Sequence, residues 1–366
     1  MHARRFHAPG RVNLIGEHTD YSGGFVLPAA ISRGVSLEVT FGGDRIVLAS
    51  GLDGAQVDLA ADGSQTPDTG WGRYVAAVAA ELADLGRAPV GMRGQLQSDL
   101  PTGSGLSSSA ALEVALGLAL CAAADLDLEE LALAAAMQRA ELRGVGVPCG
   151  IMDQAASVLG ARDHAVFLDC STLDHRLVPL PVDLDLVIVD SGVRRELGAS
   201  AYAQRRTELE AALVALGGRR PQDVDPGELE ELAYRAALDD VSQRRLRHVV
   251  TENARVGRVE TALTGPGGAD RQALGELFAH GHASLRDDFE VSVRELDVLV
   301  EIARTSGAVA ARMTGGGFGG AIVALVEHGR VDDVVEGIVA AYADACPDRT
   351  ATVIVTQASD GAGEVS

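Results

Sequence analysis

The sequence contains no lysine, so all 31 of its lysine-or-arginine positions are arginines. The P-loop nucleotide site ends in Gly-Lys followed by Ser or Thr, and this class of site is therefore excluded. Protein kinases need a strand lysine and Schiff-base enzymes need a lysine amine, so both classes are excluded as well. Any phosphate site must therefore be made locally positive without lysine.

Cysteine and long apolar runs are also scarce. The four cysteines are widely spaced and form no Cys-x-x-Cys pair, which predicts reduced structural thiols in a cytoplasmic protein. The N-terminus lacks the apolar core of a signal peptide, and no apolar run is long enough to span a bilayer, so no membrane association is expected. A net charge of -21 argues against nucleic acid and anionic lipid as partners, because the protein's field repels both.

The length of 366 residues and the apolar fraction of 47% predict two domains, each with its own core. We expect one domain over residues 1–181 and a second over 182–366. Both mix strand and helix patterns, so the predicted fold class is α+β. Helices are expected at 73–85, 108–124, 128–142, from 153, within 199–304 and at 331–343, and strands at 35–41, 45–49, 92–100, 165–169, 184–189, 308–313, 321–326 and 352–355.

Two local expectations concern turns and termini. Gly42-Gly43-Asp44 lies between two strand patterns, which predicts a hairpin at that point. Residues 58–70 read as a surface loop. The tail from Ser359 is rich in glycine and alanine, and we expect it to fray.

A loop rich in glycine and serine runs from Pro101 to Ser109 and leads directly into a helical pattern. Glycine lets backbone N–H groups point inward, serine adds hydroxyl donors, and a helix start offers free N–H groups at the positive end of its dipole. An ordinary helix N-cap needs only one such residue, whereas this loop has Gly103, Gly105 and three serines. The pattern therefore predicts a phosphate site.

A polar cluster lies between Gly10 and Tyr21, where apolar residues alternate with the hydrogen-bonding side chains of Arg11, Asn13, Glu17, His18 and Asp20. This mixture of donors and acceptors suits a polyhydroxyl ligand such as a sugar, whose hydroxyl groups both donate and accept. A solvated turn with an Arg11–Glu17 ion pair is the alternative. A metal site is not favoured, because His18 and Asp20 lack a partner histidine at helical spacing.

Three further features carry weaker signals. Gly315 to Gly320 fits Gly-x-Gly-x-x-Gly, but a strand pattern follows it, so it predicts close packing or the approach of a ligand and no dinucleotide fold. Asp153 stands where a loop enters a helix, as an acid–base candidate or a helix cap. Glu141 stands near a helix end, where it either reaches a divalent ion or faces solvent.

Taken together, these segments resemble the GHMP sugar kinases. The resemblance covers nearly the whole chain and rests on Gly10–Tyr21, Gly103–Ala111, Gly150–Gln154, Leu285–Asp288 and Arg312–Gly320. It implies a two-domain fold, with a left-handed β-α-β crossover in the N-terminal domain, a ferredoxin-like C-terminal α+β domain, and the active site between them. Because Arg11 comes early, we expect the leader that precedes this motif in the family to be largely missing.

The segment Glu17-His18-Thr19-Asp20-Tyr21 is similar to the signature of family members that act on galactose. The resemblance therefore implies ATP-dependent phosphorylation of the C1 hydroxyl of α-D-galactose, with Mg²⁺ required. A monomer is the default expectation for the cytoplasmic protein that the cysteines predict. Two alternatives remain open, namely a kinase for N-acetylgalactosamine or arabinose and a catalytically silent sugar sensor. The intact serine loop and Asp153 argue against the sensor.

The resemblance also implies roles for individual residues. Asp153 and Arg11 form the catalytic pair, with Asp153 acting as a base or as a positioning group. The sugar pocket is expected to contain Arg11, Glu17, His18, Asp20, Asp153 and Tyr202. The phosphates are expected at Gly103, Gly105, Ser107 and Ser108, the adenine at Trp71 and Tyr74, and Mg²⁺ at Ser109 and Glu141.

Overall fold

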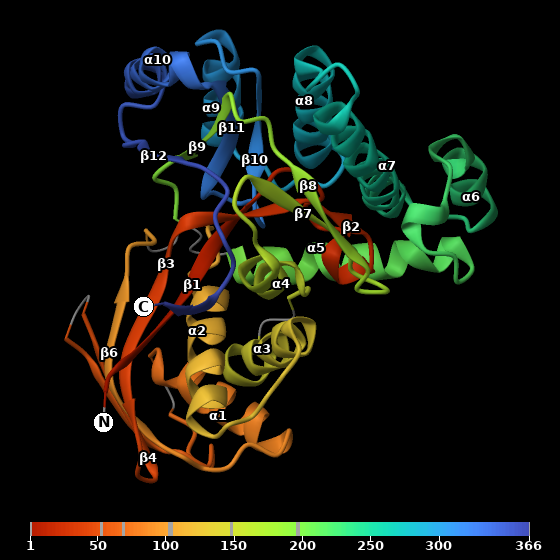
Figure 1. Cartoon of the computed structure of the whole chain (residues 1–366). Coiled ribbons are helices and arrows are strands. Elements are labelled where there is room, and N and C mark those ends of the chain that lie inside the picture. Colours follow the sequence, from red (N-terminus) through yellow and green to blue (C-terminus); the bar gives the residue numbers. More distant parts are fainter. Residues whose placement is uncertain are drawn as a thin grey trace.

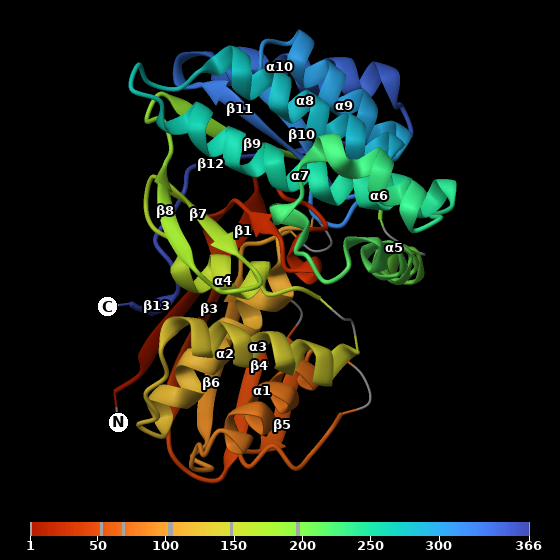
Figure 2. The ribbon, with the colours of Figure 1, turned by 90° about the vertical axis from the view of Figure 1, so that its right-hand side faces the viewer.

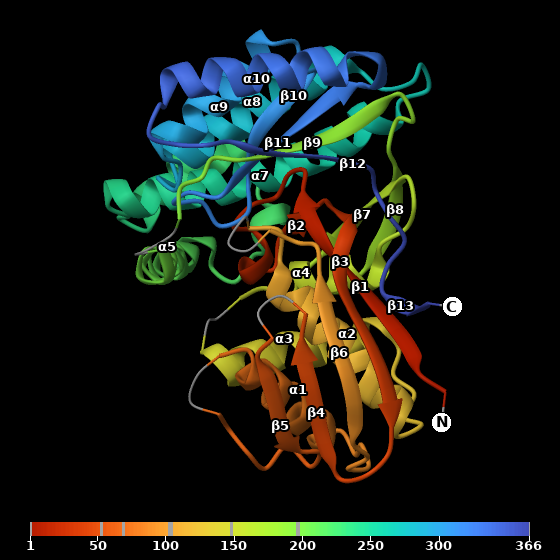
Figure 3. The same cartoon turned by 90° about the vertical axis from the view of Figure 1, so that its left-hand side faces the viewer.

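The computed structural model describes residues 2–51, 54–67, 70–101, 105–146, 149–194 and 198–365. Its N-terminal half is built on a six-stranded sheet in the order β13-β1-β3-β6-β4-β5. Helices cover one face of this sheet, and Figure 3 shows the sheet from the opposite side, with those helices behind it. The strands are β1 (Arg4–Asn13), β3 (Pro28–Phe41), β4 (Arg45–Ser50), β5 (Gln56–Ala60), β6 (Met92–Ser98) and β13 (Gly363–Val365).

The predicted hairpin between β3 and β4 is wrong. Strand β6 lies between them, antiparallel to β3 and parallel to β4. Strand β4 instead forms an antiparallel pair with β5, part of which falls in the segment expected to be a loop. The chain then passes through helix α1 (Gly72–Asp84) and enters the sheet as β6. A turn pattern marks where the chain reverses, but it does not show whether another strand is inserted beside it.

Four helices pack beside this sheet. They are α1, α2 (Ser108–Ala123), α3 (Glu130–Val145) and α4 (Met152–Leu159), close to the predicted bounds. Helix α2 is apolar on almost every side because it lies between strands β1 and β3 and helices α1, α3 and α4. The many small alanine side chains let these helices approach one another closely, so a core with few aromatic residues is still well filled.

The C-terminal half is built on a four-stranded antiparallel sheet in the order β10-β11-β9-β12. Along the chain, β9 (Leu184–Asp190), β10 (Ala310–Thr314), β11 (Ala321–Glu327) and β12 (Thr352–Thr356) alternate with helices as β-α-β-β-α-β. This order and topology confirm the expected ferredoxin-like arrangement. The helices of this half are α5 (Gly198–Leu213), α6 (Leu229–Arg235), α7 (Asp240–Thr264), α8 (Arg271–Asp287), α9 (Arg294–Thr305) and α10 (Val331–Ala345). Helices α8, α9 and α10 contact the sheet, α7 contacts α8, and α5 contacts α7. Figure 2 shows α10 at the top of this half and α5 below the sheet.

A small sheet connects the two halves. It contains β2 (Phe25–Val26), β7 (His164–Asp169) and β8 (His175–Pro179). The division into two domains near residue 181 stays a prediction. Single 3-10 turns occur at Asp20–Ser22, Val214–Leu216, Pro221–Asp223, Pro226–Glu228 and His328–Arg330. Cysteines 121, 149, 170 and 346 are free. Across the described ranges, no helix combines the length and the apolar character that crossing a membrane requires.

The expectation of a frayed tail is wrong along its described length. Strand β13 pairs antiparallel with the start of β1. Before it, the N–H of Gly361 donates to the carbonyl of Gly160 at 2.7 Å, and the N–H of Ala362 donates to that of Ser157 at 2.8 Å. The Ser157 hydroxyl donates in turn to the carbonyl of Pro9 at 2.7 Å. The tail therefore ties β1 to helix α4.

Replacing Gly361 by valine should loosen this tie. A Cβ at Gly361 would lie 2.3 Å from the carbonyl oxygen of Val158, whereas a Cβ at Gly363 would have no atom within 4 Å. We expect Gly361→Val to lower the free energy of unfolding by about 1–3 kcal/mol in urea denaturation. The control Gly363→Val should change it by less than about 0.5 kcal/mol. Equal effects of the two substitutions would contradict this packing of the tail.

Candidate active site

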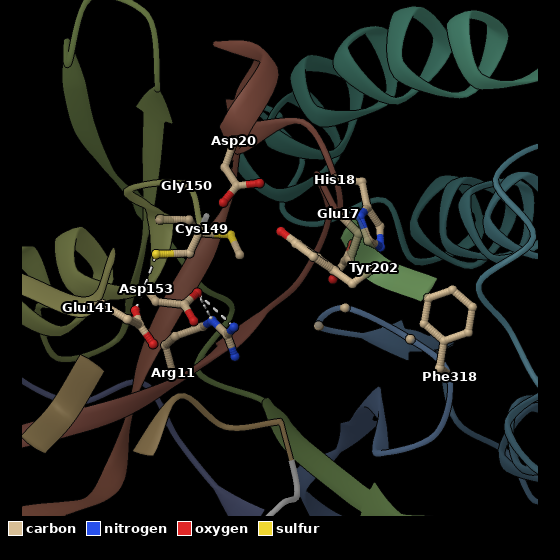
Figure 4. Close-up of a pocket in the computed structure, with 14 residues that line it drawn as sticks. Arg11, Glu17, His18, Asp20, Glu141, Cys149, Gly150, Asp153, Tyr202 and Phe318 are labelled. Atoms are coloured by element: carbon tan, nitrogen blue, oxygen red, sulfur yellow. Dashed lines mark hydrogen bonds and ion pairs between the residues drawn. The ribbon is translucent and has the colours of Figure 1, made fainter. Parts of the chain in front are cut away.

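A cavity of about 390 Å³ is lined by segments from both halves of the chain. Figure 4 shows Asp153, Glu141 and Cys149 on one side of it and His18, Tyr202 and Phe318 on the other. All six residues predicted for the sugar pocket lie in its wall, and the glycine loop after β10 completes it. The described lining is Arg11, Glu17, His18, Asp20, Glu141, Cys149, Gly150, Met152, Asp153, Tyr202, Gly315, Gly316, Gly317 and Phe318.

The carboxylate of Asp153 is held by groups from two other segments. The Nε and Nη2 atoms of Arg11 lie 2.8 Å and 2.7 Å from its Oδ1 atom, and the hydroxyl of Ser107 donates to Oδ2. Arg11 Nη1 also donates to the carbonyl of Gly105 at 2.6 Å. The Asp153 side chain does not cap helix α4, and Arg11 does not pair with Glu17, so both alternatives considered from the sequence are wrong.

The serine loop lies beside this carboxylate. Ser107 has a positive φ of 58°, and α2 begins at the next residue, the exposed Ser108. The bond from Arg11 to the carbonyl of Gly105 brings the loop against β1. Gly103 lies outside the described residues. The loop residues that are described therefore stand next to Asp153, although they are not part of the cavity wall.

A second group of carboxyls lies behind Asp153. Glu141 Oε2 accepts hydrogen bonds from Gln154 Nε2 at 2.7 Å and from the Cys149 thiol at 3.3 Å. Gln154 Nε2 also lies 3.1 Å from Oε2 of the buried Glu113. Burial raises the pKa of Glu141, and the charge of Asp153 raises it further, while a hydrogen bond from Ser109 opposes both. A buried carboxyl group with a raised pKa, that of Glu141, therefore lies beside the Ser109 hydroxyl.

The residues predicted to contact adenine lie at the start of α1, outside the cavity lining. Trp71 and Tyr74 are half-buried and pack on the N-terminal core. Burial raises the pKa of Tyr74, and the charges of Glu141 and Glu113 raise it further, so its ring lies near the carboxyl group behind Asp153.

Asp20 lines the same cavity as Asp153. Burial raises the pKa of Asp20 to about 6, and the charge of Asp153 contributes to this rise. Gly150 is packed directly against the Asp20 carboxyl, because a Cβ at Gly150 would lie only 2.0 Å from Oδ2. This close approach explains why the chain has glycine at the entry to α4.

Aromatic rings form the opposite wall. The His18 ring, whose residue has a positive φ of 63°, lies 4.6 Å from the ring of Phe289 and 5.5 Å from that of Tyr202. Its Nδ1 atom is 3.0 Å from the hydroxyl of Tyr21. Burial raises the pKa of Tyr202 well above its usual value, so its hydroxyl stays protonated. The wall therefore offers an apolar surface with polar groups at its edge, as a sugar ring requires.

Glu17 is held by Arg312, which also binds Glu252, and the sequence identified neither partner as part of the site. Arg312 Nη2 lies 2.6 Å from Glu17 Oε2 and 2.7 Å from Glu252 Oε1, and all three side chains are buried. Burial raises the pKa of Glu17 to about 7, although Arg312 opposes this shift. The one available signal was the presence of Arg312 within the apolar strand β10, because a charge there needs a buried partner.

His248 fixes the backbone of the same segment. Its Nε2 atom lies 3.1 Å from the carbonyl of Glu17, and its Nδ1 atom lies 3.0 Å from the hydroxyl of Ser284. Burial lowers the pKa of this imidazole to about 4, so the ring is neutral at neutral pH. Helix α7 therefore supports the Glu17 side of the cavity through His248 as well as through Glu252.

The chain is similar to known proteins over its whole length. Residues 2–40 match the galactokinase galactose-binding signature, 73–161 the GHMP kinases N terminal domain, and 268–344 the GHMP kinases C terminal region. A curated galactokinase from Roseiflexus sp. (strain RS-1) is 44% identical, over 98% of this chain and 92% of that protein.

Two solved structures extend the comparison. Lactococcus lactis galactokinase complexed with galactose is 33% identical and superposes with a TM-score of 0.93, over 99% of this chain and 95% of that one. L. major mevalonate kinase in complex with R-mevalonate is 22% identical with a TM-score of 0.65, over 98% and 97% of the two chains, which shows a shared fold alone.

The buried neutral His248 should make the protein acid-sensitive. Its folded pKa of about 4 lies below the ordinary value of 6.5, so the unfolded chain binds the proton more tightly. The stability linked to this group is therefore complete above about pH 6.5 and is lost as the pH falls toward 4. Between pH 7 and pH 5 we expect His248 to account for about 2 kcal/mol of lost unfolding free energy.

Urea denaturation of the wild type and of His248→Gln at both pH values measures this contribution. The variant should lose about 2 kcal/mol less than the wild type on acidification, whatever its stability at pH 7. Identical losses in the two proteins would show that His248 is not the group responsible.

Proposed function

The chain belongs to the galactokinase branch of the GHMP kinases, and we propose that its cavity is where the γ-phosphate of ATP passes to the C1 hydroxyl of α-D-galactose. The products are galactose 1-phosphate and ADP. The observation that carries the proposal is the Asp153 carboxylate, which lines a sugar-sized cavity and is bound by Arg11 and by the serine loop.

In the proposed step, the C1 oxygen of galactose forms a bond to the γ-phosphorus, and the bond from that phosphorus to the β–γ bridging oxygen breaks. The electron pair of the broken bond leaves with ADP. The hydroxyl proton passes to the Asp153 carboxylate, either as attack proceeds or afterwards. Arg11 holds that carboxylate and offsets negative charge on the moving phosphoryl group, so alignment and charge neutralisation provide most of the acceleration.

The sugar is proposed to lie between Asp153 and the aromatic wall. Glu17 and Asp20 would accept its hydroxyl groups, and His18, Tyr202 and Arg11 would complete the hydrogen bonds. The galactose-binding signature favours galactose over N-acetylgalactosamine or arabinose. Because the carboxylate, the arginine and the serine loop are all present, a catalytically silent sensor is not favoured either.

The ATP side of the site is proposed to follow the serine loop. Gly103, Gly105, Ser107 and Ser108 would surround the phosphates, at the N-terminal end of α2, where N–H groups and the helix dipole attract anions. Trp71 and Tyr74 would contact the adenine. In this arrangement the backbone and Arg11 take the role that a lysine has in P-loop enzymes.

Ser109 and Glu141 would hold Mg²⁺. The region has a carboxylate with a neighbouring hydroxyl, and the described residues contain no cluster of three or more metal-binding side chains. This small number of protein ligands fits Mg²⁺, which usually binds one or two protein carboxylates and completes its coordination with water and substrate phosphates. The ion would neutralise phosphate charge. We further propose a cytoplasmic monomer with domains at 1–181 and 182–366.

Asp153→Asn tests the proposed base. It should lower kcat by at least about a hundredfold in an assay of galactose-dependent ADP release, while calorimetry finds ATP affinity nearly unchanged. The control is Asp163→Asn, at an exposed residue just beyond α4 with a positive φ that asparagine tolerates. Activity of Asp153→Asn within about tenfold of wild type would sink the assignment.

The sugar preference is measured in the same assay, with N-acetylgalactosamine and arabinose offered in place of galactose.

Glu141→Gln tests the proposed metal site. It should raise the Mg²⁺ concentration for half-maximal activity by about 10- to 100-fold, and it should weaken calorimetric binding of ADP with Mg²⁺ more than that of ADP alone. Glu130→Gln, at an exposed position on the same helix α3, is the matched control. An unchanged Mg²⁺ requirement in Glu141→Gln would place the ion elsewhere.

A further inference from the structure

A single buried guanidinium forms ion pairs with two carboxylates beside the proposed sugar cavity. Arg312, on β10, lies 2.6 Å from Glu17 and 2.7 Å from Glu252, on α7. The exposed fractions of the three side chains are 0%, 1% and 0%. Of the three, Glu17 lines the cavity, and it comes from the loop after β1. The cluster therefore links the sugar cavity to a strand and a helix of the other half of the chain.

Glu17 uses only one of its two oxygens in this cluster. Oε2 is bound by Arg312, whereas Oε1 is buried and has no hydrogen-bond partner within the described part of the chain. A buried acceptor without a partner costs about 1–3 kcal/mol, and more when it is charged. A ligand hydroxyl that reaches Oε1 would remove that cost, so the geometry favours a hydroxylated ligand at this atom.

Glu252 is anchored by more contacts than Glu17. Its Oε1 atom accepts the N–H of Gly16 at 3.0 Å as well as Arg312, and its Oε2 atom accepts Arg255 Nε at 2.8 Å. Arg312 has little room to move, because α8 packs against its Nη1 atom at Gly281, where a Cβ would lie only 2.6 Å away. The guanidinium is therefore fixed between a well-anchored carboxylate and one that faces the ligand.

We propose that Arg312 and Glu252 are positioning residues for the sugar: Arg312 holds Glu17 so that Oε1 meets a sugar hydroxyl, and Glu252, by sharing the guanidinium, sets the pH range of sugar binding. The inference rests on the proposed function, because it takes Glu17 as a sugar contact. Neither residue touches the sugar itself.

The charges around Glu17 determine in which direction its pKa, and with it the pH range of sugar binding, is shifted. Burial raises its pKa to about 7; Arg312 and Arg11 oppose the rise, and Glu252 adds to it. Although burial acts the other way, Arg312 and Arg255 hold the pKa of Glu252 far below its usual range, so Glu252 stays charged. The groups facing this cluster are Arg11 from β1, Arg312 from β10, Glu252, Arg255 and the neutral His248 from α7, and the uncharged Gly281 from α8.

An ionised carboxylate accepts a stronger hydrogen bond than a protonated one, so galactose affinity should fall as the pH drops through about 7. Glu252→Gln keeps the shape of the side chain but removes its charge, and Arg312 then serves Glu17 alone. The pKa of Glu17 should fall, and the acidic limit of galactose binding should move to lower pH by at least about one unit.

The test is the pH dependence of galactose binding, measured by calorimetry from about pH 5 to about pH 9. In Glu17→Gln the fall in galactose affinity near pH 7 should disappear, which assigns this pH dependence to Glu17. In Glu252→Gln the fall in affinity should remain, but at a pH below 7. Glu260→Gln is the matched control, because it makes the same change on helix α7 at a carboxylate that also pairs with an arginine, Arg176. It should leave the pH of this fall unchanged.

Asp20 is expected to cause a separate fall in galactose affinity near pH 6, which none of these variants removes.

A second, independent experiment uses Arg312→Lys, whose ammonium group cannot bridge two carboxylates as a planar guanidinium does. It should raise the KM for galactose by about tenfold or more and leave the KM for ATP unchanged.

The outcomes separate this inference from the proposed function. Wild-type protein that fails to phosphorylate galactose would overturn the proposed function. Active wild type with a fall in affinity that stays at the same pH or moves to higher pH in Glu252→Gln, or with equal rises of both KM values in Arg312→Lys, would overturn the inference alone. If Glu252→Gln does not fold, the KM values of Arg312→Lys decide the inference.

Discussion

The buried ion pair between Arg11 and Asp153 is the constraint on which the site depends. Removing a guanidinium from water is costly unless its donors are satisfied, and here only 6% of the Arg11 side chain is exposed. Its donors reach the Asp153 carboxylate and the carbonyl of Gly105. Strand β1, the serine loop and helix α4 must therefore meet at fixed distances around the Asp153 carboxylate.

Contacts outside the cavity hold these elements in place. At one end of β1, Asn13 exchanges hydrogen bonds with the Thr314 hydroxyl at 3.1 Å and 3.0 Å, which ties it to β10. At the other end, β13 pairs with β1, and the tail binds Ser157 of helix α4. The Arg11–Asp153 pair is thus positioned by the six-stranded sheet, the four-stranded sheet and the C-terminal tail, and not by its own segments alone.

Contiguous motifs could be predicted from the sequence, whereas long-range pairings could not. The serine loop, the sugar cluster and most helices are local patterns of residue type and spacing, so each was recognisable where it stands. Arg312 and Glu252 are far from Glu17 in the sequence. No local sequence pattern predicts which of the charged residues will come together in the fold. The insertion of β6 beside β3 was hidden for the same reason, because a turn pattern carries no information about a strand that arrives later.

The charge of the cavity explains how two unlike substrates could share it. Among the described lining residues, the carboxyl groups of Glu17, Asp20, Glu141 and Asp153 face a single arginine, Arg11. A neutral sugar suits such a wall, because its hydroxyl groups donate to carboxylates. The polyanionic ATP does not suit it without a cation, since like charges at close range repel strongly in a partly buried site. The chain has no lysine, so in the proposed site the positive charge would come from a bound cation, from the N-terminal end of α2 and from Arg11. In the proposed function, this excess of carboxylates would make nucleotide binding depend on the cation, whereas sugar binding would depend on the carboxylates themselves.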